Sequence, residues 1–362
     1  MDRRSFIKKA GLVGGAAAAS TTLAAPAYAQ GKRKLTMVTT WPRGAAGVWD
    51  SVERAASNIT EMTEGSLEIE TKAAGELVGA FEVFDAVSSG QADMYHGADY
   101  YFINQHPAFA FFTAVPYGMT APEMMAWYYN QGGMKLHHEL GELFNIKSFI
   151  AGNTGGQGGG WYRNPINSAE DYNGLKFRMP GLGGKVVGVL GASVQNLPGG
   201  EIYQALSSGA LDATEWIGPW SDEKLGLQEV AKYYYPAGFH EPGAALSVAT
   251  NLEVWNSLTP GQQRAVEVGS LEAHQYTYGL YIGNNGPALQ RLKDAGVNMG
   301  VLSDDVWDAF GRGTEEVMAE FMGDEMFKKV YDSFLAGMKS SSNWVSVSDS
   351  TYTAQRARVL GL

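Results

Sequence analysis

The sequence of 362 residues contains no cysteine. This absence excludes disulfide bonds, a thiol nucleophile and a cysteine-ligated zinc site. Histidine is also scarce, and His96, His106 and His240 are too scattered along the chain to suggest a histidine-rich metal site. We expect these three histidines to be structural. The sequence also shows no Ser/His/Asp pattern that pairs a nucleophile with a base, so it predicts a protein that is not an enzyme.

The chain lacks an excess of positive charge, because its formal net charge is −11. This sign argues against nucleic acid or an anionic membrane as a partner. Nucleotide-binding motifs are missing too. The glycine tract at 155–160 does not match Gly-x-Gly-x-x-Gly. The segment around Gly181–Lys185 does not match a P-loop, because Met179 stands in place of the first glycine of that motif and Val186 stands in place of Ser/Thr.

The first 29 residues have the pattern of an export signal. Arg3 and Arg4 precede a short, weakly apolar run that ends in Ala-Tyr-Ala at 27–29. The run is shorter than the roughly 20 apolar residues of a membrane span. Its Arg-Arg-x-Phe-Ile-Lys start resembles a twin-arginine signal, which exports folded proteins. Removal of this segment leaves 333 residues with a net charge of about −14, enough chain for two lobes.

Strand and helix patterns alternate along the rest of the chain, which is typical of α/β construction. β-branched and alternating segments predict strands, and apolar residues at helical spacing predict helices. We expect strands at 34–40, 67–71, 92–94, 149–153, 175–179, 212–214 and 244–250, and helices at 48–62, 121–144 and 260–295. The pattern of the remaining tail to Leu362 is mainly helical.

One stretch of sequence recurs. The segment 84–94 matches 203–213 by residue class at an offset of 119, and both read as a helix, a Ser-Ser-Gly stop and a strand. A common helix–turn–strand arrangement that recurs by chance would give such a match. We favour the alternative, in which two similarly built α/β lobes face each other across a shared cleft.

Polar side chains follow several of these strands. Arg178 comes just before a Pro-Gly break, and Glu215 and Trp216 come just before a Gly-Pro break. In open α/β sheets, ligands bind at the carboxyl ends of strands. A planar guanidinium suits bidentate binding of a carboxylate. Gln157, within the glycine tract, and Glu241, in an aromatic loop, add further oxygen atoms.

These residues suggest a cation as well as an anion. The side chains of Gln157, Glu215 and Glu241 and the carbonyl of Trp216 offer only hard oxygens, which select Na⁺ or Ca²⁺ rather than zinc. Arg178 and a cation together would neutralise a carboxylate, and Trp and Tyr side chains would cover its apolar part. The glycines around Gln157 either let the backbone approach a ligand or form a hinge, and both readings stay open.

Five motifs resemble one family: Thr-Thr-Trp-Pro at 39–42, the glycine tract to Trp161, Leu-Lys-Phe-Arg-Met-Pro-Gly at 175–181, Asp-Ala-Thr-Glu-Trp-Ile-Gly-Pro at 212–219 and Phe-His-Glu-Pro-Gly at 239–243. The chain resembles the solute-binding subunits of TRAP transporters, the DctP type. It is most similar to the branch that binds 2-oxo and 2-hydroxy monocarboxylates such as pyruvate and lactate. Related members bind sugar alcohols or aromatic acids.

The resemblance implies an α/β, two-lobed periplasmic binding protein of type II-like fold, with a hinge and long C-terminal helices. It implies that Arg178 binds the carboxylate and that Gln157, Glu215, the Trp216 carbonyl and Glu241 bind a cation that the substrate also contacts. It further implies that Asn153 and Tyr101 line the pocket. The partners would be a membrane permease and, in some members, a second copy held by swapped C-terminal helices.

We expect residues 30–153 and 242–281 to form lobe I, residues 154–241 and 282–330 to form lobe II, and residues 331–362 to form a helical arm. The expected location is the periplasm. Two other classes compete with a receptor. An exported enzyme acting on 2-oxo acids through the same cation lacks a nucleophile–base pair. A structural or adhesive envelope protein fits poorly with polar residues at strand ends.

Overall fold

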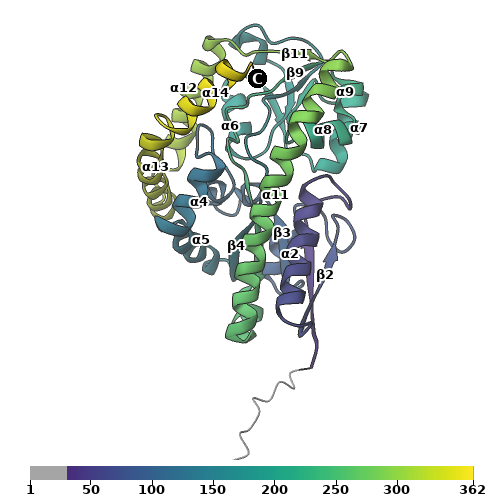
Figure 1. The fold of residues 1–362 in the computed structure, drawn as a ribbon, viewed down its shortest axis with the longest axis vertical. Helices are drawn as coiled ribbons and strands as arrows, with labels where there is room; N and C mark the ends of the chain where they lie inside the picture. The colour runs from purple at the N-terminus through teal and green to yellow at the C-terminus, as the bar shows by residue number, and fades with distance from the viewer. Residues whose placement is uncertain (1–30, 362) are drawn as a thin grey trace, which may run out of the picture.

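The computed structural model describes residues 31–361, which form two mixed β-sheets with helices around them (Figure 1). The predicted signal peptide at 1–29 lies outside the described residues. None of the helices in the described part combines the length and apolar character that a membrane crossing requires.

The first sheet has the strand order β2-β1-β3-β10-β4. Its strands are β1 (Arg33–Thr39), β2 (Leu67–Lys72), β3 (Met94–Gly97), β4 (Ile146–Asn153) and β10 (Ala245–Asn251). β1 pairs in parallel with β2 and β3, and β10 runs antiparallel to both β3 and β4. The helices α2 (Val48–Met62), α3 (Val83–Ser88) and α10 (Leu252–Ser257) connect or follow these strands.

The second sheet has the order β11-β9-β5-β8-β6-β7. Its strands are β5 (Gly160–Tyr162), β6 (Lys176–Arg178), β7 (Ser193–Gln195), β8 (Ala213–Thr214), β9 (Tyr233–Tyr235) and β11 (Asn298–Met299). β6 is parallel to β7 and β8, and β5 is antiparallel to β8 and β9. The helices of this lobe are α6 (Gly181–Val189), α7 (Gly199–Ser208), α8 (Pro219–Leu225) and α9 (Leu227–Val230).

The two sheets share one topology. In each, the first parallel strand lies between the second and the third, an antiparallel strand follows the third, and the next strand is antiparallel to that one, so that β2-β1-β3-β10-β4 corresponds to β7-β6-β8-β5-β9. The recurring sequence segments occupy matching places, since α3 leads into β3 and α7 leads into β8. The interpretation of the repeat as two similarly built lobes is therefore confirmed.

Helix α11 (Pro260–Asp294) lies along both lobes (Figure 1). It begins as the sequence predicts: Thr259 accepts a hydrogen bond from the Gln262 backbone N–H, the Gln262 side chain accepts one from the Thr259 N–H, and Pro260 occupies the first turn. Its first half packs on α2 and β4 of the first lobe, and its second half packs on α8 of the second. One helix thus connects the two lobes.

The helix predicted at 121–144 was wrong as a single element. The structure has two helices there, α4 (Ala121–Asn130) and α5 (Gly133–Glu142). They separate at Gly132, whose φ of 97° is left-handed and incompatible with a continuous helix. Smaller differences concern strand ends, because β3 starts two residues later than predicted and β8 begins at Ala213 rather than Asp212.

Three helices complete the chain: α12 (Asp304–Phe321), α13 (Glu325–Val345) and α14 (Asp349–Leu360). α13 packs on α4 and on the 3₁₀ segment η2 (Pro107–Phe112) through Phe327, Val330 and Phe334, whereas α14 has no buried residue. Two further 3₁₀ segments are η1 (Asp99–Phe102) and η3 (Ala169–Tyr172). The two-lobed α/β fold with long C-terminal helices is as the resemblance implied.

Candidate functional site

Arg178 is the last residue of β6, and its side chain is fully buried. Its Nε donates to the Leu197 carbonyl at 3.0 Å, and its Nη1 donates to the Glu215 carbonyl at 3.1 Å and to the Glu215 carboxylate. Its Nη2 lies 3.4 Å from the hydroxyl of Tyr101, in the other lobe. The guanidinium is thus held on one side by the second lobe and faces the first lobe on the other.

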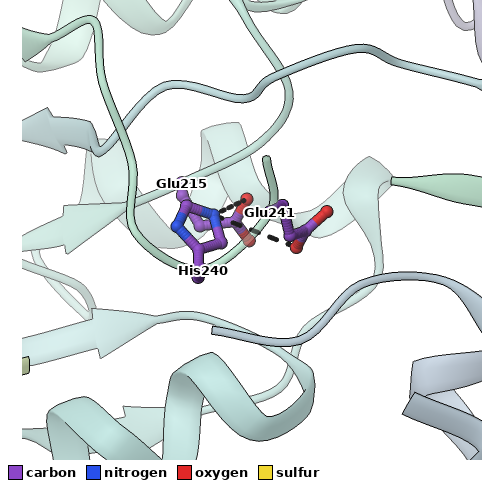
Figure 2. A group of neighbouring side chains, drawn as sticks. All are labelled: Glu215, His240 and Glu241. Carbon is purple, nitrogen blue, oxygen red and sulfur yellow. Dashed lines mark hydrogen bonds and ion pairs between the residues drawn. The ribbon is translucent and has the colours of Figure 1, made fainter. Parts of the chain in front are cut away.

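Glu215 follows β8, the strand next to β6, so the neighbouring parallel strands bring it to Arg178. The loop after β9 brings two more residues, His240 and Glu241 (Figure 2). His240 Nε2 lies 3.4 Å from Glu215 Oε2 and 3.9 Å from Glu241 Oε1. All three side chains are buried, and one ligand atom of each lies within 4.8 Å of the others. This spacing is suited to a metal ion.

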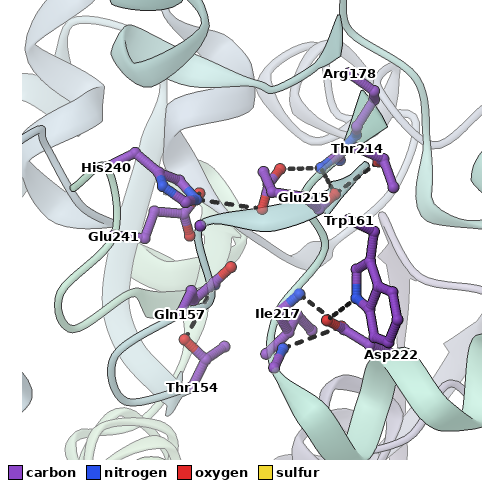
Figure 3. A network of polar contacts seen from close by, with 12 residues as sticks. Thr154, Gln157, Trp161, Arg178, Thr214, Glu215, Ile217, Asp222, His240 and Glu241 are labelled. Carbon is purple, nitrogen blue, oxygen red and sulfur yellow. Dashed lines mark hydrogen bonds and ion pairs between the residues drawn. The ribbon is translucent and has the colours of Figure 1, made fainter. Parts of the chain in front are cut away.

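Two buried oxygens at this place have no hydrogen-bond partner among residues 31–361, Gln157 Oε1 and Glu241 Oε2. Gln157 is fixed beside Glu241, because its backbone N–H donates to the Glu241 carbonyl at 2.9 Å and its side-chain amide donates to Thr154 Oγ1 at 3.1 Å (Figure 3). Among residues 31–361, no group donates a hydrogen bond to the Trp216 carbonyl. Unpartnered buried oxygens are costly unless a ligand satisfies them, so these residues fit a hard cation.

Electrostatics support the same conclusion. Burial, and then the nearby charge of Glu215, raise the pKa of the Glu241 carboxyl well above its ordinary value of 4.5. The charge of Arg178 and the nearby hydroxyl of Tyr100 oppose this rise in the pKa only in part. Two buried carboxyls beside one guanidinium therefore leave an excess of negative charge, which a cation would neutralise.

Asp222 shapes the loop that carries Glu215 and Trp216. Its Oδ1 accepts hydrogen bonds from the backbone N–H groups of Ile217 and Gly218, each at 3.0 Å, and its Oδ2 accepts from Trp161 Nε1 at 2.8 Å (Figure 3). Burial raises the pKa of Asp222 from 3.8 to about 7, although these three donors favour the ionised form. The carboxylate fixes the chain just beyond the site.

Aromatic rings surround the guanidinium. Trp216 lies 5.5 Å from the Arg178 guanidinium. The Trp41 ring, from the end of β1 in the other lobe, lies 6.3 Å from Trp216 and 6.1 Å from Tyr101. Gly199 permits this packing, because a Cβ there would lie 2.2 Å from the Trp216 ring. The rings provide an apolar surface next to a guanidinium, a group suited to an anion.

The structure brings together most of the residues that the sequence singled out: Arg178, Gln157, Glu215, Trp216, Glu241 and Tyr101 are all buried in this region. Asn153 is buried too, but its described contacts are with the backbone of Gly155 and Gly243. These contacts shape the loop that leads to Gln157.

Sequence reasoning missed several neighbours of this site. His240 was expected to be a structural residue, and the structure places it among the carboxylates. Its place directly before Glu241 was the available signal. Tyr100, Asp222 and Trp41 were also not singled out as site residues, since their contacts come from segments far apart in the chain.

The chain is similar to known proteins over most of its length. Residues 44–325 match the DctP family of bacterial extracellular solute-binding proteins, family 7. The monocarboxylate 2-oxoacid-binding periplasmic protein of Nostoc is 41% identical over 317 residues, which are 87% of each chain.

Two solved structures are similar over almost the whole described chain. A TRAP periplasmic solute-binding protein from Pseudoalteromonas atlantica, with bound sodium and pyruvate, has a TM-score of 0.86 and 36% identity over 89% of this chain and 99% of its own. One from Bordetella bronchiseptica, a dimer with calcium and picolinate in one site, has a TM-score of 0.89 and 32% identity over 91% of this chain and 99% of its own. The buried arginine and oxygen cluster thus lie in a chain that belongs to the DctP family, the solute-binding proteins of TRAP transporters.

Proposed function

We propose that this protein is the solute receptor of a TRAP transporter that binds a small 2-oxo or 2-hydroxy monocarboxylate, such as pyruvate or lactate, together with Na⁺ or Ca²⁺. The observation that carries the proposal is the position of the unpartnered oxygens Gln157 Oε1 and Glu241 Oε2 beside the Arg178–Glu215 pair. One group for an anion and several for a cation share one buried place. The Nostoc and Pseudoalteromonas relatives support the ligand class.

Each residue has a separate role in this proposal. Arg178 binds the carboxylate through Nη2, the guanidinium nitrogen with the weakest contacts within the protein. The oxygens of Gln157, Glu215, Glu241 and the Trp216 carbonyl hold the cation, which supplies positive charge that the ligand's oxygens contact. Tyr101 lies beside Nη2 and orients the carboxylate, and Asn153 fixes the loop that carries Gln157.

In this proposal, the two lobes, which α11 connects, close on the ligand when it binds. The lobes are those expected from the sequence, 30–153 with 242–281 and 154–241 with 282–330, followed by the arm at 331–362. The division of the strands between the sheets supports these boundaries. Contacts across the lobes include the Arg178–Tyr101 hydrogen bond and one from Ser221 Oγ to the Ala46 carbonyl at 2.9 Å. The glycines around Gln157 act as part of the hinge.

The proposed receptor binds its ligand reversibly and delivers it to the membrane permease without chemical change. The alternative within the family is a receptor for a polyol or an aromatic acid. Picolinate, which the Bordetella relative binds, is an aromatic acid, so the test of ligands includes this class. An exported enzyme acting on 2-oxo acids would show turnover of pyruvate, which a receptor would not.

We also propose export to the periplasm by the twin-arginine route and a homodimer formed through the C-terminal arm. Five large apolar side chains of the arm are at least 64% exposed: Trp344, Val347, Tyr352, Val359 and Leu360. Such a set on the end of a chain is typical of an interface, and the Bordetella relative is a dimer.

Thermal unfolding tests the proposed function. The mature protein, refolded to remove ligand, is heated with pyruvate, lactate, a polyol or an aromatic acid, with and without Na⁺ or Ca²⁺. Ligand at 100 times its Kd adds roughly 2.7 kcal/mol to the free energy of unfolding, which raises Tm by a few degrees. A shift with pyruvate that needs the cation supports the proposal. A shift only with polyols or aromatic acids contradicts the ligand class, and no shift with any of them contradicts the receptor function.

A further inference from the structure

A buried hydrogen-bonded chain runs from the Trp41 ring to β4 in the first lobe. Trp41 Nε1 donates to His96 Nδ1 at 2.9 Å, His96 Nε2 lies 3.0 Å from Ser51 Oγ, and Ser51 Oγ donates to the Ala151 carbonyl at 2.6 Å. His96 and Ser51 are fully buried, and Trp41 is 2% exposed. The chain joins β1, β3, α2 and β4, so it links the ring to the centre of the lobe.

The donors and acceptors in this chain have only one consistent arrangement. An indole nitrogen donates and never accepts, so His96 Nδ1 must be the acceptor. The neutral imidazole then carries its proton on Nε2 and donates it to Ser51 Oγ, whose own proton goes to the Ala151 carbonyl. Burial lowers the pKa of His96 from 6.5 to about 3, which keeps the ring neutral. Each polar group in this series of hydrogen bonds therefore has a partner.

The chain also leaves Trp41 little freedom to rotate. Ser51 approaches β4 closely because position 152 is glycine: a Cβ there would lie 2.6 Å from Ser51 Oγ. On the other side, the Trp41 ring meets Trp216 of the opposite lobe at 6.3 Å with an interplanar angle of 71°. Rotation of Trp41 would break its hydrogen bond to His96 and open the aromatic surface around Arg178.

We propose that His96 is a positioning residue that holds the Trp41 ring against Trp216 and thereby limits the size of the acid that the site accepts. The size limit rests on the proposed function, because an acid whose carboxylate lies on Arg178 Nη2 must place its carbon chain near Tyr101, Trp41 and Trp216. With the ring fixed, a short acid fits and a branched one meets the indole.

Two measurements on the same variants test this. Fluorine NMR of protein labelled with 5-fluorotryptophan reports the environment of Trp41, whose resonance is assigned by its loss in Trp41→Phe. Titration calorimetry in Ca²⁺ then gives the Kd of pyruvate and of the branched 4-methyl-2-oxopentanoate. The variants are His96→Leu, which removes both hydrogen bonds, and His96→Asn, which keeps an acceptor near the Nδ1 position. The matched control is His274→Leu, because His274 is also a buried histidine but lies on a different element, α11.

We expect His96→Leu to move the Trp41 resonance and to reduce the preference for pyruvate over the branched acid about 10-fold, and His96→Asn to restore much of both. His274→Leu leaves the resonance and the preference unchanged. An unmoved Trp41 resonance in His96→Leu, or an equal loss of affinity for both acids, overturns the proposal. If His96→Leu does not fold, Ser51→Ala, which removes the acceptor of the His96 N–H, takes its place with the same expected directions.

Failure of the proposed function is recognisable separately. If the unmodified protein binds neither acid with any cation, the function and the size limit both fall. The fluorine resonance still decides whether His96 positions Trp41, because it requires no ligand.

Discussion

Arg178 and Glu215 bind each other at the ends of two adjacent parallel strands, β6 and β8, with the guanidinium contacting both the backbone carbonyl and the carboxylate of Glu215. The group proposed to bind the anion and one proposed to bind the cation are therefore in direct contact. Binding of the two ligands should be coupled, since each neutralises charge that the other meets.

Arg178→Lys tests whether the shape of the guanidinium matters beyond its charge. Lysine keeps the positive charge but lacks the planar pair of donors, so it cannot bind Leu197, Glu215 and a ligand carboxylate together. We expect the Kd for pyruvate to rise about 100-fold in titration calorimetry. Arg163→Lys is the control, because Arg163 is partly buried in the same lobe and donates to backbone carbonyls. Unchanged affinity in Arg178→Lys would remove Arg178 from the site.

Glu241→Gln should make the free energy of unfolding depend less on pH and less on the cation. A carboxyl whose pKa is raised on folding binds protons more readily in the folded protein, so without cation the free energy of unfolding falls as pH rises above 4.5 towards the folded pKa. Glutamine removes that fall and the repulsion with Glu215. We expect the variant without cation to be more stable at pH 8 than the unmodified protein, and to gain less from Ca²⁺.

The measurement for Glu241→Gln is chemical unfolding between pH 5 and 8, with and without Ca²⁺. Glu223→Gln serves as control, since Glu223 pairs with Arg291 at the surface. A Ca²⁺ gain equal to that of the unmodified protein would show that Glu241 is not a cation ligand.

The sequence predicted the local features of the fold, and it singled out the oxygen atoms that the structure brings together at the candidate site. Capping at Thr259 and the strand ends at Arg178 and Glu215 depend on neighbouring residues, so they can be recognised from short patterns. Residues 121–144 were misread because the apolar pattern continues across Gly132, and the left-handed backbone there has only a single glycine as its signal.

The missed parts of the site depend on contacts between distant segments. His240 joins Glu215 across 25 residues, and Trp41 joins His96 across 55. No periodicity or motif in one segment indicates such a partner. The lobes themselves could be inferred because the same helix–turn–strand segment recurs in each, which leaves a signal in the sequence.

Asp222→Asn should weaken cation binding without touching a ligand atom. An amide keeps one acceptor oxygen for Ile217 and Gly218 but cannot also accept from Trp161 Nε1. The loop after Glu215 then loses a constraint, and we expect the Kd for Ca²⁺ to rise about 10-fold, the effect of a lost residue that orients metal ligands.

Asp222 also predicts a pH effect. Its folded pKa of about 7 lies above its ordinary 3.8, so its contribution to the free energy of unfolding is present below about pH 4 and is lost as pH rises to 7. Unfolding curves of Asp222→Asn between pH 4 and 8 should be flatter than those of the unmodified protein. An unaltered slope together with unaltered Ca²⁺ affinity would contradict this role.

Removal of residues 346–362 should convert the proposed dimer into a monomer. The deleted segment contains α14, which has no buried residue and carries Tyr352, Val359 and Leu360 in exposed positions. Light scattering after gel filtration measures the mass, and calorimetry with pyruvate should show an unchanged Kd. Leu143→Ser, which removes an equally exposed apolar side chain elsewhere, should leave the mass unchanged. A truncated protein that remains a dimer would place the interface elsewhere.

The most direct test is a titration of the cation-free mature protein with pyruvate in the absence and presence of Ca²⁺, and with Ca²⁺ in the absence and presence of pyruvate. Contact between Arg178 and Glu215 predicts that each ligand tightens the other by the same factor, about 10-fold or more. Pyruvate binding that is equally tight with and without Ca²⁺, and with Na⁺ in its place, would contradict a shared site for the acid and the cation.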